Sequence, residues 1–181
     1  MEFQILYALQ ELHTPLLNRI MVFITRLGDG GIFWLVLAGV LLLFRKTRKC
    51  GLTILVSMAI CYLLGNIFLK NVIARPRPSS MDPTVPLLIP TPREYSFPSG
   101  HTHHGFTAAT AIFLHFKKPG IAALVLAALI AFSRMYLFVH FPTDILGGMI
   151  LGIGVAVLVY MVIMKRNKNL QKVWLETFVK I

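Results

Sequence analysis

Long apolar segments recur along this chain, and they constrain its fold more than any other feature of the sequence. Four of them reach the length of about 20 mainly apolar residues that a helix needs to cross a bilayer. They cover 31–44 with its flanks, 50–69, 119–137 and 144–164. Only 14% of the 181 residues are charged and 56% are hydrophobic, which leaves too little polar surface for a soluble domain. The sequence therefore predicts a protein whose solvent is lipid.

Two further segments complete the predicted bundle. Residues 99–116 form a fifth apolar helix that is more polar at its start, and residues 14–27 form a weaker sixth. Pro15 indicates a break between this sixth segment and the lead-in at 1–12. We therefore expect an all-α protein with one transmembrane domain over 1–181, built from six membrane-spanning helices.

The net charge of +11 is arranged in a way that indicates membrane topology rather than nucleic-acid binding. Eleven of the eighteen basic residues lie in alternate connections or in the C-terminal tail: Arg45, Lys46, Arg48, Lys49, Lys117, Lys118, Lys165, Arg166, Lys168, Lys172 and Lys180. Cytoplasmic flanks of membrane helices are enriched in Lys and Arg. We therefore expect a multi-pass protein of the cell (plasma or inner) membrane with cytoplasmic N- and C-termini, and with 27–31, 70–98 and 138–143 outside.

Five basic residues break this pattern, because they lie on the side predicted to be extracytoplasmic: Lys70, Arg75, Arg77, Arg93 and Arg134. Charged side chains at membrane depth are kept where they pair or bind something. The nearby acidic residues Asp82, Glu94 and Asp144 are too few to neutralise all five. An anionic ligand would balance the excess, and the alternative is that each side chain snorkels to the headgroups.

The connection 70–98 is the only long one, and it holds seven of the ten prolines, all between 76 and 98. Proline excludes a helix interior and favours extended or turn structure. Loops of this length are usually functional or disordered. We interpret this one as a stiff cover or entrance over a site, with a mere spacer as the alternative.

The stretch EYSFPSGHTHHGFTAA, residues 94–109, places polar residues where an apolar helix begins. Ser99 suits a helix cap, and Gly100 lets a ligand approach the backbone closely. Free N–H groups at a helix N-terminus bind anions, and His101 lies within the first turn. Zinc is disfavoured at this histidine cluster, because neighbouring histidines on one helix turn point in different directions. We therefore expect no metal and no cofactor.

A second polar cluster follows at SRMYLFVHFPTD, residues 133–144. His140 and Asp144 are four residues apart, so that the carboxylate can lie beside the imidazole and hold one tautomer. A histidine oriented by an aspartate is typical of a general base or a nucleophile. Two histidines, several cations and a helix N-terminus around one pocket indicate phosphoryl transfer. A transporter or channel for anions or phospholipids is the alternative from another class, but it does not explain His101 or the His140–Asp144 pair.

Three motifs of this sequence resemble those of the type 2 phosphatidic acid phosphatase family. KNVIARPRP gives a lysine, six residues and Arg-Pro at Lys70 and Arg77; PSGH follows at 98–101; the third motif gives Ser133, Arg134, His140 and Asp144 in the family's spacing. The resemblance implies a six-helix membrane fold with a core like that of bacterial acid phosphatases and vanadium haloperoxidases.

The resemblance also implies roles for individual residues. His140 would attack phosphorus and form a phosphohistidine, Asp144 would orient it, and His101 would protonate the leaving oxygen and then activate water. The phosphoryl oxygens would be bound by Lys70, Arg77, Ser99, Gly100 and Arg134. Further candidate substrate contacts are Arg75, Arg93 and His104.

The function implied by the resemblance is hydrolysis of a phosphomonoester or diphosphate on a membrane lipid, without a metal, at the extracytoplasmic face. Members of this size act on undecaprenyl diphosphate, phosphatidylglycerophosphate or phosphatidic acid. The additional cations Arg75 and Arg93 favour the diphosphate. The expected partners are the lipid substrate and the bilayer, and no nucleic acid.

Overall fold

The computed structural model describes residues 1–178, with side chains up to Lys165. The described residues form helices and irregular connections, with no strand among them. The helices are α1 (Glu2–Gln10), α2 (Pro15–Arg26), η1 (Asp29–Gly31), α3 (Ile32–Leu43), α4 (Arg48–Cys61), η2 (Tyr62–Leu69), α5 (Lys70–Ile73), α6 (Pro78–Met81), α7 (Gly100–His115), α8 (Lys117–Tyr136) and α9 (Pro142–Phe178). The basic residues Arg166, Lys168, Lys172 and Lys180 of the tail lie outside the described side chains.

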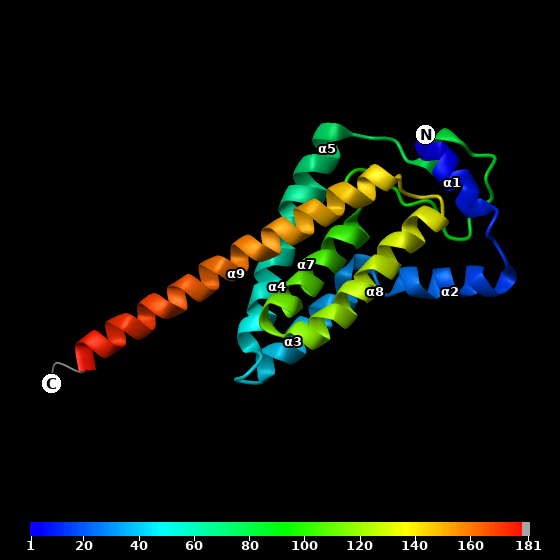
Figure 1. Cartoon of the computed structure of the whole chain (residues 1–181). Coiled ribbons are helices and arrows are strands. Elements are labelled where there is room, and N and C mark those ends of the chain that lie inside the picture. Colours follow the sequence, from blue (N-terminus) through cyan, green and yellow to red (C-terminus); the bar gives the residue numbers. More distant parts are fainter. Residues whose placement is uncertain (179–181) are drawn as a thin grey trace.

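Helix α7 lies at the centre of the bundle (Figure 1), where it packs against α8, α9 and α4. All of its residues from Thr102 to Ile112 are buried. Ala108, Ala109 and Ala111 are fully buried, and their small size lets the neighbouring helices approach closely. Gly152 of α9 lies so near α7 that a Cβ there would stand 2.6 Å from the carbonyl oxygen of His103. Small residues are a common means of packing helices tightly in membranes.

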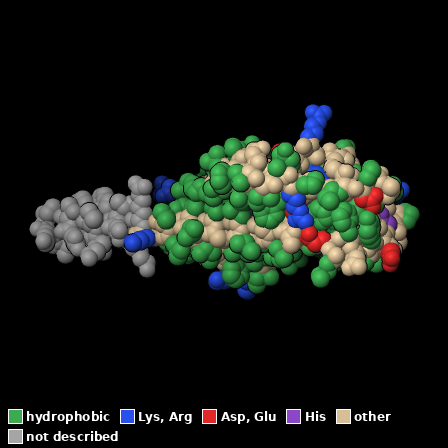
Figure 2. Space-filling view, turned by 90° about the horizontal axis from the view of Figure 1, so that it is seen from above, with side chains coloured by type: hydrophobic (Ala, Val, Ile, Leu, Met, Phe, Trp, Pro, Cys, Tyr) green, Lys and Arg blue, Asp and Glu red, His purple; other side chains and the backbone are tan. Residues whose placement is uncertain are grey.

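Four segments among the described residues are long and apolar enough to span a membrane: Pro15–Leu43, Arg48–Met81, Lys117–Tyr136 and Pro142–Lys165. Exposed apolar side chains cover much of the flank of the bundle in Figure 2, as expected for a surface in contact with lipid. The chain is therefore a multi-pass membrane protein. Helix α7 is not among the four segments, because it has only 16 residues and its first turns are polar.

The predicted count of six spanning helices is not confirmed, and α2 and α3 are the main reason. Leu17 of α2 packs against Tyr136 at the end of α8, whereas Leu41 of α3 shares a hollow with Pro119 near the start of α8. The turn at η1 only bends the path, and Gly30 and Gly31 adopt the positive φ values of 58° and 68° that it requires. The segments 14–27 and 31–44 therefore make one passage along α8 instead of two.

Helix α1 lies at the same end of the bundle as the connection between α5 and α7 (Figure 1). Tyr7 donates a hydrogen bond of 2.7 Å to Asp82, and Gln10 donates one of 3.0 Å to the carbonyl of Tyr136. The prediction that the N-terminal segment lies at the end opposite the site is therefore wrong. The error comes from counting α2 and α3 as two passages. Because they make one passage, α1 lies at the same end of the bundle as the site.

Candidate active site

A pocket of about 540 Å³ opens at this end of the bundle, between η1, the end of η2, the proline-rich connection and the start of α7. Its lining brings together most of the residues singled out in the sequence: Lys70, Arg77, Arg93, Gly100, His101, His104, Arg134 and His140. The proline-rich connection forms one wall of the pocket through 88–94, as the sequence predicted. Residues far apart along the chain thus face one space.

His140 and Asp144 form a buried pair in the floor of the pocket. Nδ1 of His140 lies 3.4 Å from Oδ2 of Asp144, and the two side chains are 2% and 0% exposed. The same carboxylate oxygen accepts hydrogen bonds from the hydroxyl of Ser96, at 2.5 Å, and from the backbone N–H of Phe141, at 2.8 Å. Pro142 begins α9 two residues after His140, so the first turn of that helix carries Asp144 back to the imidazole.

Arg77 faces the other nitrogen of the same imidazole. Its Nη1 lies 3.0 Å from Nε2 of His140 and also donates to the carbonyl of Val139, at 2.8 Å. Because a guanidinium only donates, Nε2 carries the lone pair and Nδ1 the proton. Burial lowers the pKa of His140 well below its ordinary value, although Asp144 opposes the shift. The ring is therefore neutral, with an unprotonated nitrogen facing the pocket.

Two further cations are buried beside this histidine. Lys70 pairs with the carboxylate of Glu94, and Arg134 donates a hydrogen bond of 2.5 Å to Thr25. Nε of Arg134 is buried without a hydrogen-bond partner. Lys70, Arg77 and Arg134 are all less than 5% exposed. Buried charge of one sign is costly unless something compensates it, so this cluster is suited to bind an anion.

His101 has a carboxylate partner that the sequence analysis did not identify. Its Nε2 lies 2.9 Å from Oδ1 of Asp29, in the turn between α2 and α3. Gly28 makes this approach feasible, since a Cβ there would stand 2.6 Å from Cδ2 of His101. The sequence GDGG at 28–31 was the available signal, because an acidic residue in a glycine-rich turn can approach another segment closely. Burial lowers the pKa of His101, and the carboxylate of Asp29 opposes this shift because it favours the protonated imidazole.

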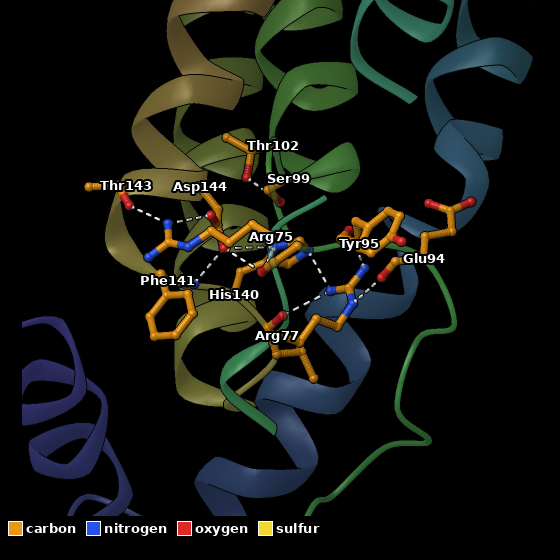
Figure 3. A network of polar contacts seen from close by, with 12 residues as sticks. Arg75, Arg77, Glu94, Tyr95, Ser99, Thr102, His140, Phe141, Thr143 and Asp144 are labelled. Atoms are coloured by element: carbon orange, nitrogen blue, oxygen red, sulfur yellow. Dashed lines mark hydrogen bonds and ion pairs between the residues drawn. The ribbon is translucent and has the colours of Figure 1, made fainter. Parts of the chain in front are cut away.

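Three predicted site residues lie outside the pocket lining: Asp144, described above, and Ser99 and Arg75. Ser99 is fully buried, and its hydroxyl accepts a hydrogen bond of 2.9 Å from Thr102. It is therefore packed behind Gly100, without access to the pocket. Arg75 lies on the far side of Asp144, to which its Nη1 donates at 2.8 Å (Figure 3). Arg75 was predicted as a possible substrate contact, but it does not line this pocket, because the carboxylate it binds stands between it and His140.

A second histidine of the cluster, His103, is buried and bonded away from the ligand space. Its Nε2 lies 2.8 Å from Oδ1 of Asn66, on η2. Asn66 lines the pocket and donates to Glu94 at 3.5 Å. The segment η2 is a π-helix, and π-helical segments often occur at functional sites. Here η2 carries Asn66 and leads directly into Lys70. Sequence reasoning missed Asn66, since an isolated amide inside an apolar segment carries no motif.

Comparison with known proteins agrees with this geometry. The model of the PAP2 superfamily matches residues 51–168, which includes every residue of the three motifs. The chain belongs to the PAP2 superfamily. The resemblance found in the motifs is thereby confirmed.

This PAP2 chain is similar to an undecaprenyl-diphosphatase of Sulfolobus acidocaldarius, with 37% identity over 75% of the chain and 66% of that protein. It thus spans just under two thirds of that relative's length. The crystal structure of a transmembrane PAP2 type phosphatidylglycerolphosphate phosphatase from Bacillus subtilis superposes with a TM-score of 0.70 and 31% identity, over 92% of this chain and 84% of that one.

The fold extends beyond the lipid phosphatases. A bacterial vanadium dependent iodoperoxidase superposes with a TM-score of 0.72 at 19% identity, over 87% of this PAP2 chain and 48% of the peroxidase. This likeness confirms the haloperoxidase-like fold predicted from the motifs.

Proposed function

We propose that this chain hydrolyses undecaprenyl diphosphate at the extracytoplasmic membrane face through a phosphohistidine at His140. The observation that carries the proposal is the meeting of His140, His101 and three buried cations around one pocket. The relatives named above act on lipid phosphates, and membership of their family supports lipid phosphatase activity in this chain.

In the first step, Nε2 of His140 attacks the terminal phosphorus. A bond forms between this nitrogen and phosphorus while the bond from phosphorus to the leaving oxygen breaks. His101 gives its proton to that oxygen, and Asp29 helps to keep the imidazole protonated beforehand. Lys70, Arg77 and Arg134 neutralise the phosphoryl oxygens, and the free N–H groups at the start of α7 add donors near Gly100.

In the second step, water hydrolyses the phosphohistidine. The now neutral His101 accepts a proton from the water, whose oxygen attacks phosphorus as the bond to Nε2 breaks. Inorganic phosphate leaves and His140 returns to its neutral form. Asp144 supports the positive charge that the ring of His140 carries between the two steps. These steps use the side chains named above and the backbone N–H groups at the start of α7.

The surroundings of the pocket favour a lipid as the substrate. A neighbouring hollow of about 360 Å³ shares Arg26 and Leu88 with the pocket and continues along α2 past Val22 and Phe23. Val22, Phe23 and Leu88 form an apolar wall of this hollow beside Asn18, Arg19 and Arg26, and that wall can hold the start of a prenyl or acyl chain. Arg93 lies exposed at the pocket, where it can meet the second phosphate of a diphosphate. Phosphatidylglycerophosphate and phosphatidic acid are the alternative substrates.

The proposed orientation follows from charge. Lys and Arg of the α3–α4 turn and the α7–α8 turn lie at the end of the bundle away from the pocket. The positive-inside rule then puts that end in the cytoplasm. The pocket, and α1 with it, would face outward.

The test is phosphate release by detergent-purified protein from undecaprenyl diphosphate, phosphatidylglycerophosphate and phosphatidic acid, with and without EDTA. We expect the highest kcat/KM on the diphosphate and no effect of EDTA. Absence of hydrolysis on all three lipids, with anion or lipid flux in proteoliposomes, would favour a transporter. Loss of activity in EDTA would contradict the proposed steps.

A further inference from the structure

Asp144 is held from both sides, and only one side faces His140. Its Oδ2 atom accepts from Ser96 and from the N–H of Phe141, and lies against His140. Its Oδ1 atom accepts a hydrogen bond of 2.8 Å from Nη1 of Arg75. Asp144 is fully buried, and the hydrogen bond from Arg75 places a positive charge beside its second oxygen.

Arg75 is itself fixed in one position by three groups other than Asp144. The same Nη1 donates to the hydroxyl of Thr143 at 2.6 Å, and Nη2 donates to Oε2 of Glu2 at 2.6 Å. The guanidinium lies over the ring of Phe141, with 4.1 Å from Cζ to the ring centroid. Figure 3 shows this guanidinium beside Asp144 and Thr143, away from Arg77. Because both terminal nitrogens of the planar guanidinium are hydrogen-bonded, it cannot rotate without breaking several of these contacts.

Glu2 completes the arrangement from the other end of the chain. Its Oε1 atom accepts from the hydroxyl of Thr143 at 2.7 Å and from the backbone N–H of Thr143 at 3.2 Å. Partial burial raises the pKa of Glu2, but the hydrogen bonds from Thr143 and Arg75 lower it more, and the net shift is downward. Glu2 is therefore ionised at neutral pH.

The charges of this cluster explain why Glu2 matters to His140. Asp144 and Arg75 alone would sum to zero, and a neutral pair supports a positive imidazole poorly. Glu2 adds one negative charge, so the three residues together carry −1. The ring of His140 becomes positive when Nε2 bonds to phosphorus, and a net negative cluster stabilises that charge. Solvent screens part of the charge on Glu2, whose side chain is 32% exposed. Arg75 without Glu2 would weaken the support that Asp144 gives.

We propose that Glu2 is a positioning residue for the His140–Asp144 pair, acting through Arg75 and Thr143, so that the first residue of α1 supports the reaction without touching the substrate. This inference rests on the proposed function, because it assigns Glu2 to the same reaction. Glu2 touches neither the substrate pocket nor His140. Its effect is therefore on the rate of the chemical step rather than on substrate binding.

The main variant is Glu2→Gln, which keeps the shape of the side chain and removes its charge. We expect kcat for phosphate release to fall roughly tenfold, which is the rate change that corresponds to a shift of about one unit in the pKa of His140. We expect KM to stay within about twofold of the wild-type value. Glu2→Asp keeps the charge on a shorter side chain and is expected to recover part of the loss.

The matched control breaks a different contact of α1. Tyr7 lies on α1, as Glu2 does, and donates a hydrogen bond of 2.7 Å to Asp82, away from Arg75. Tyr7→Phe and Asp82→Asn weaken the docking of α1 and leave the charge of the cluster unchanged, so we expect the kcat of wild type from both. Thermal unfolding in detergent compares the stability of all variants.

A double variant tests the route through Arg75. If Glu2 acts through Arg75, Glu2→Gln adds no further loss of kcat in a chain that already carries Arg75→Ala. An unchanged kcat in Glu2→Gln, a loss of similar size in Tyr7→Phe, or additive losses in the double variant would each overturn the inference. Failure of wild type to release phosphate from any lipid would instead refute the proposed function.

Discussion

Arg77 presents Nη1 to Nε2 of His140 at a distance of 3.0 Å, on the side of the imidazole opposite Asp144. The arginine thereby keeps Nε2 unprotonated. When substrate binds, a phosphoryl oxygen would replace the imidazole as the hydrogen-bond partner of Arg77. Backbone carbonyls of Val139, Glu94 and Tyr95 hold the rest of the guanidinium. One side chain thus orients the proposed nucleophile and prepares the anion site.

Arg77→Lys keeps the charge and removes the fork, so a single ammonium cannot meet the carbonyls and the imidazole together. We expect kcat/KM for lipid phosphate hydrolysis to fall by roughly a hundredfold. The matched control is Arg45→Lys, at the distant α3–α4 turn, which should keep the wild-type value. Equal activity of Arg77→Lys and wild type would contradict the role given to the guanidinium.

Asp29 supports the proton on His101, and its removal should slow protonation of the leaving oxygen. Asp29→Asn is expected to lower kcat between about tenfold and a hundredfold, with a smaller change in KM, since general acid catalysis contributes about 10²–10⁴ in rate. Steady-state phosphate release measures both constants. Asp82→Asn removes another exposed carboxylate at the same end and serves as control; a similar loss there would argue against a specific role of Asp29.

Glu94 occupies a place in the pocket that an anion would take. Lys70 lowers the pKa of Glu94, so this carboxylate is charged at neutral pH and competes with phosphate for the ammonium. Glu94→Gln should lower the inhibition constant of inorganic phosphate by several-fold, since one unit of opposing charge is removed. Glu11→Gln, an exposed change outside the pocket, is the control. Weaker inhibition in Glu94→Gln would show that the carboxylate helps to bind the anion.

The topology predicts which residues an impermeant thiol reagent can reach in intact cells. Cys50 and Cys61 are buried, so an added cysteine is the reactive one. Glu11→Cys should be labelled from outside, because α1 and the pocket share one end, and Lys46→Cys should be labelled only after lysis. The opposite pattern would invert the orientation, and labelling at neither position from outside would separate α1 from the external face.

The spacing of the three motifs predicted which residues meet in the pocket, because Lys70, Arg77, His101, Arg134 and His140 occur in fixed patterns with a known chemistry. Their partners could not be predicted in the same way. Asp29, Ser96 and Glu2 are single polar residues in unrelated segments, and only the tertiary fold selects them. The glycine-rich turn is a signal for Asp29 but does not name His101 as its partner, so identifying all three pairs needs the contacts themselves.

Hydropathy predicted the positions of most helices but not the number of passages. Apolar runs on either side of 28–31 look like two spans, although the glycines there only bend one. Arg75 was misplaced for a local reason. The prolines that alternate with Arg75 and Arg77 favour extended, polyproline-like backbone, in which successive side chains turn by about 120°. The two arginines therefore face different sides of Asp144 and His140.

The most direct test of the account is to trap the covalent intermediate. Purified protein is mixed with lipid diphosphate that carries a radiolabelled terminal phosphate, quenched within milliseconds under alkaline denaturing conditions, and digested for mass spectrometry. We predict an alkali-stable, acid-labile phosphate on His140 that is absent in His140→Ala, a variant without phosphate release. Hydrolysis by His140→Ala, or a labelled residue other than His140, would contradict it.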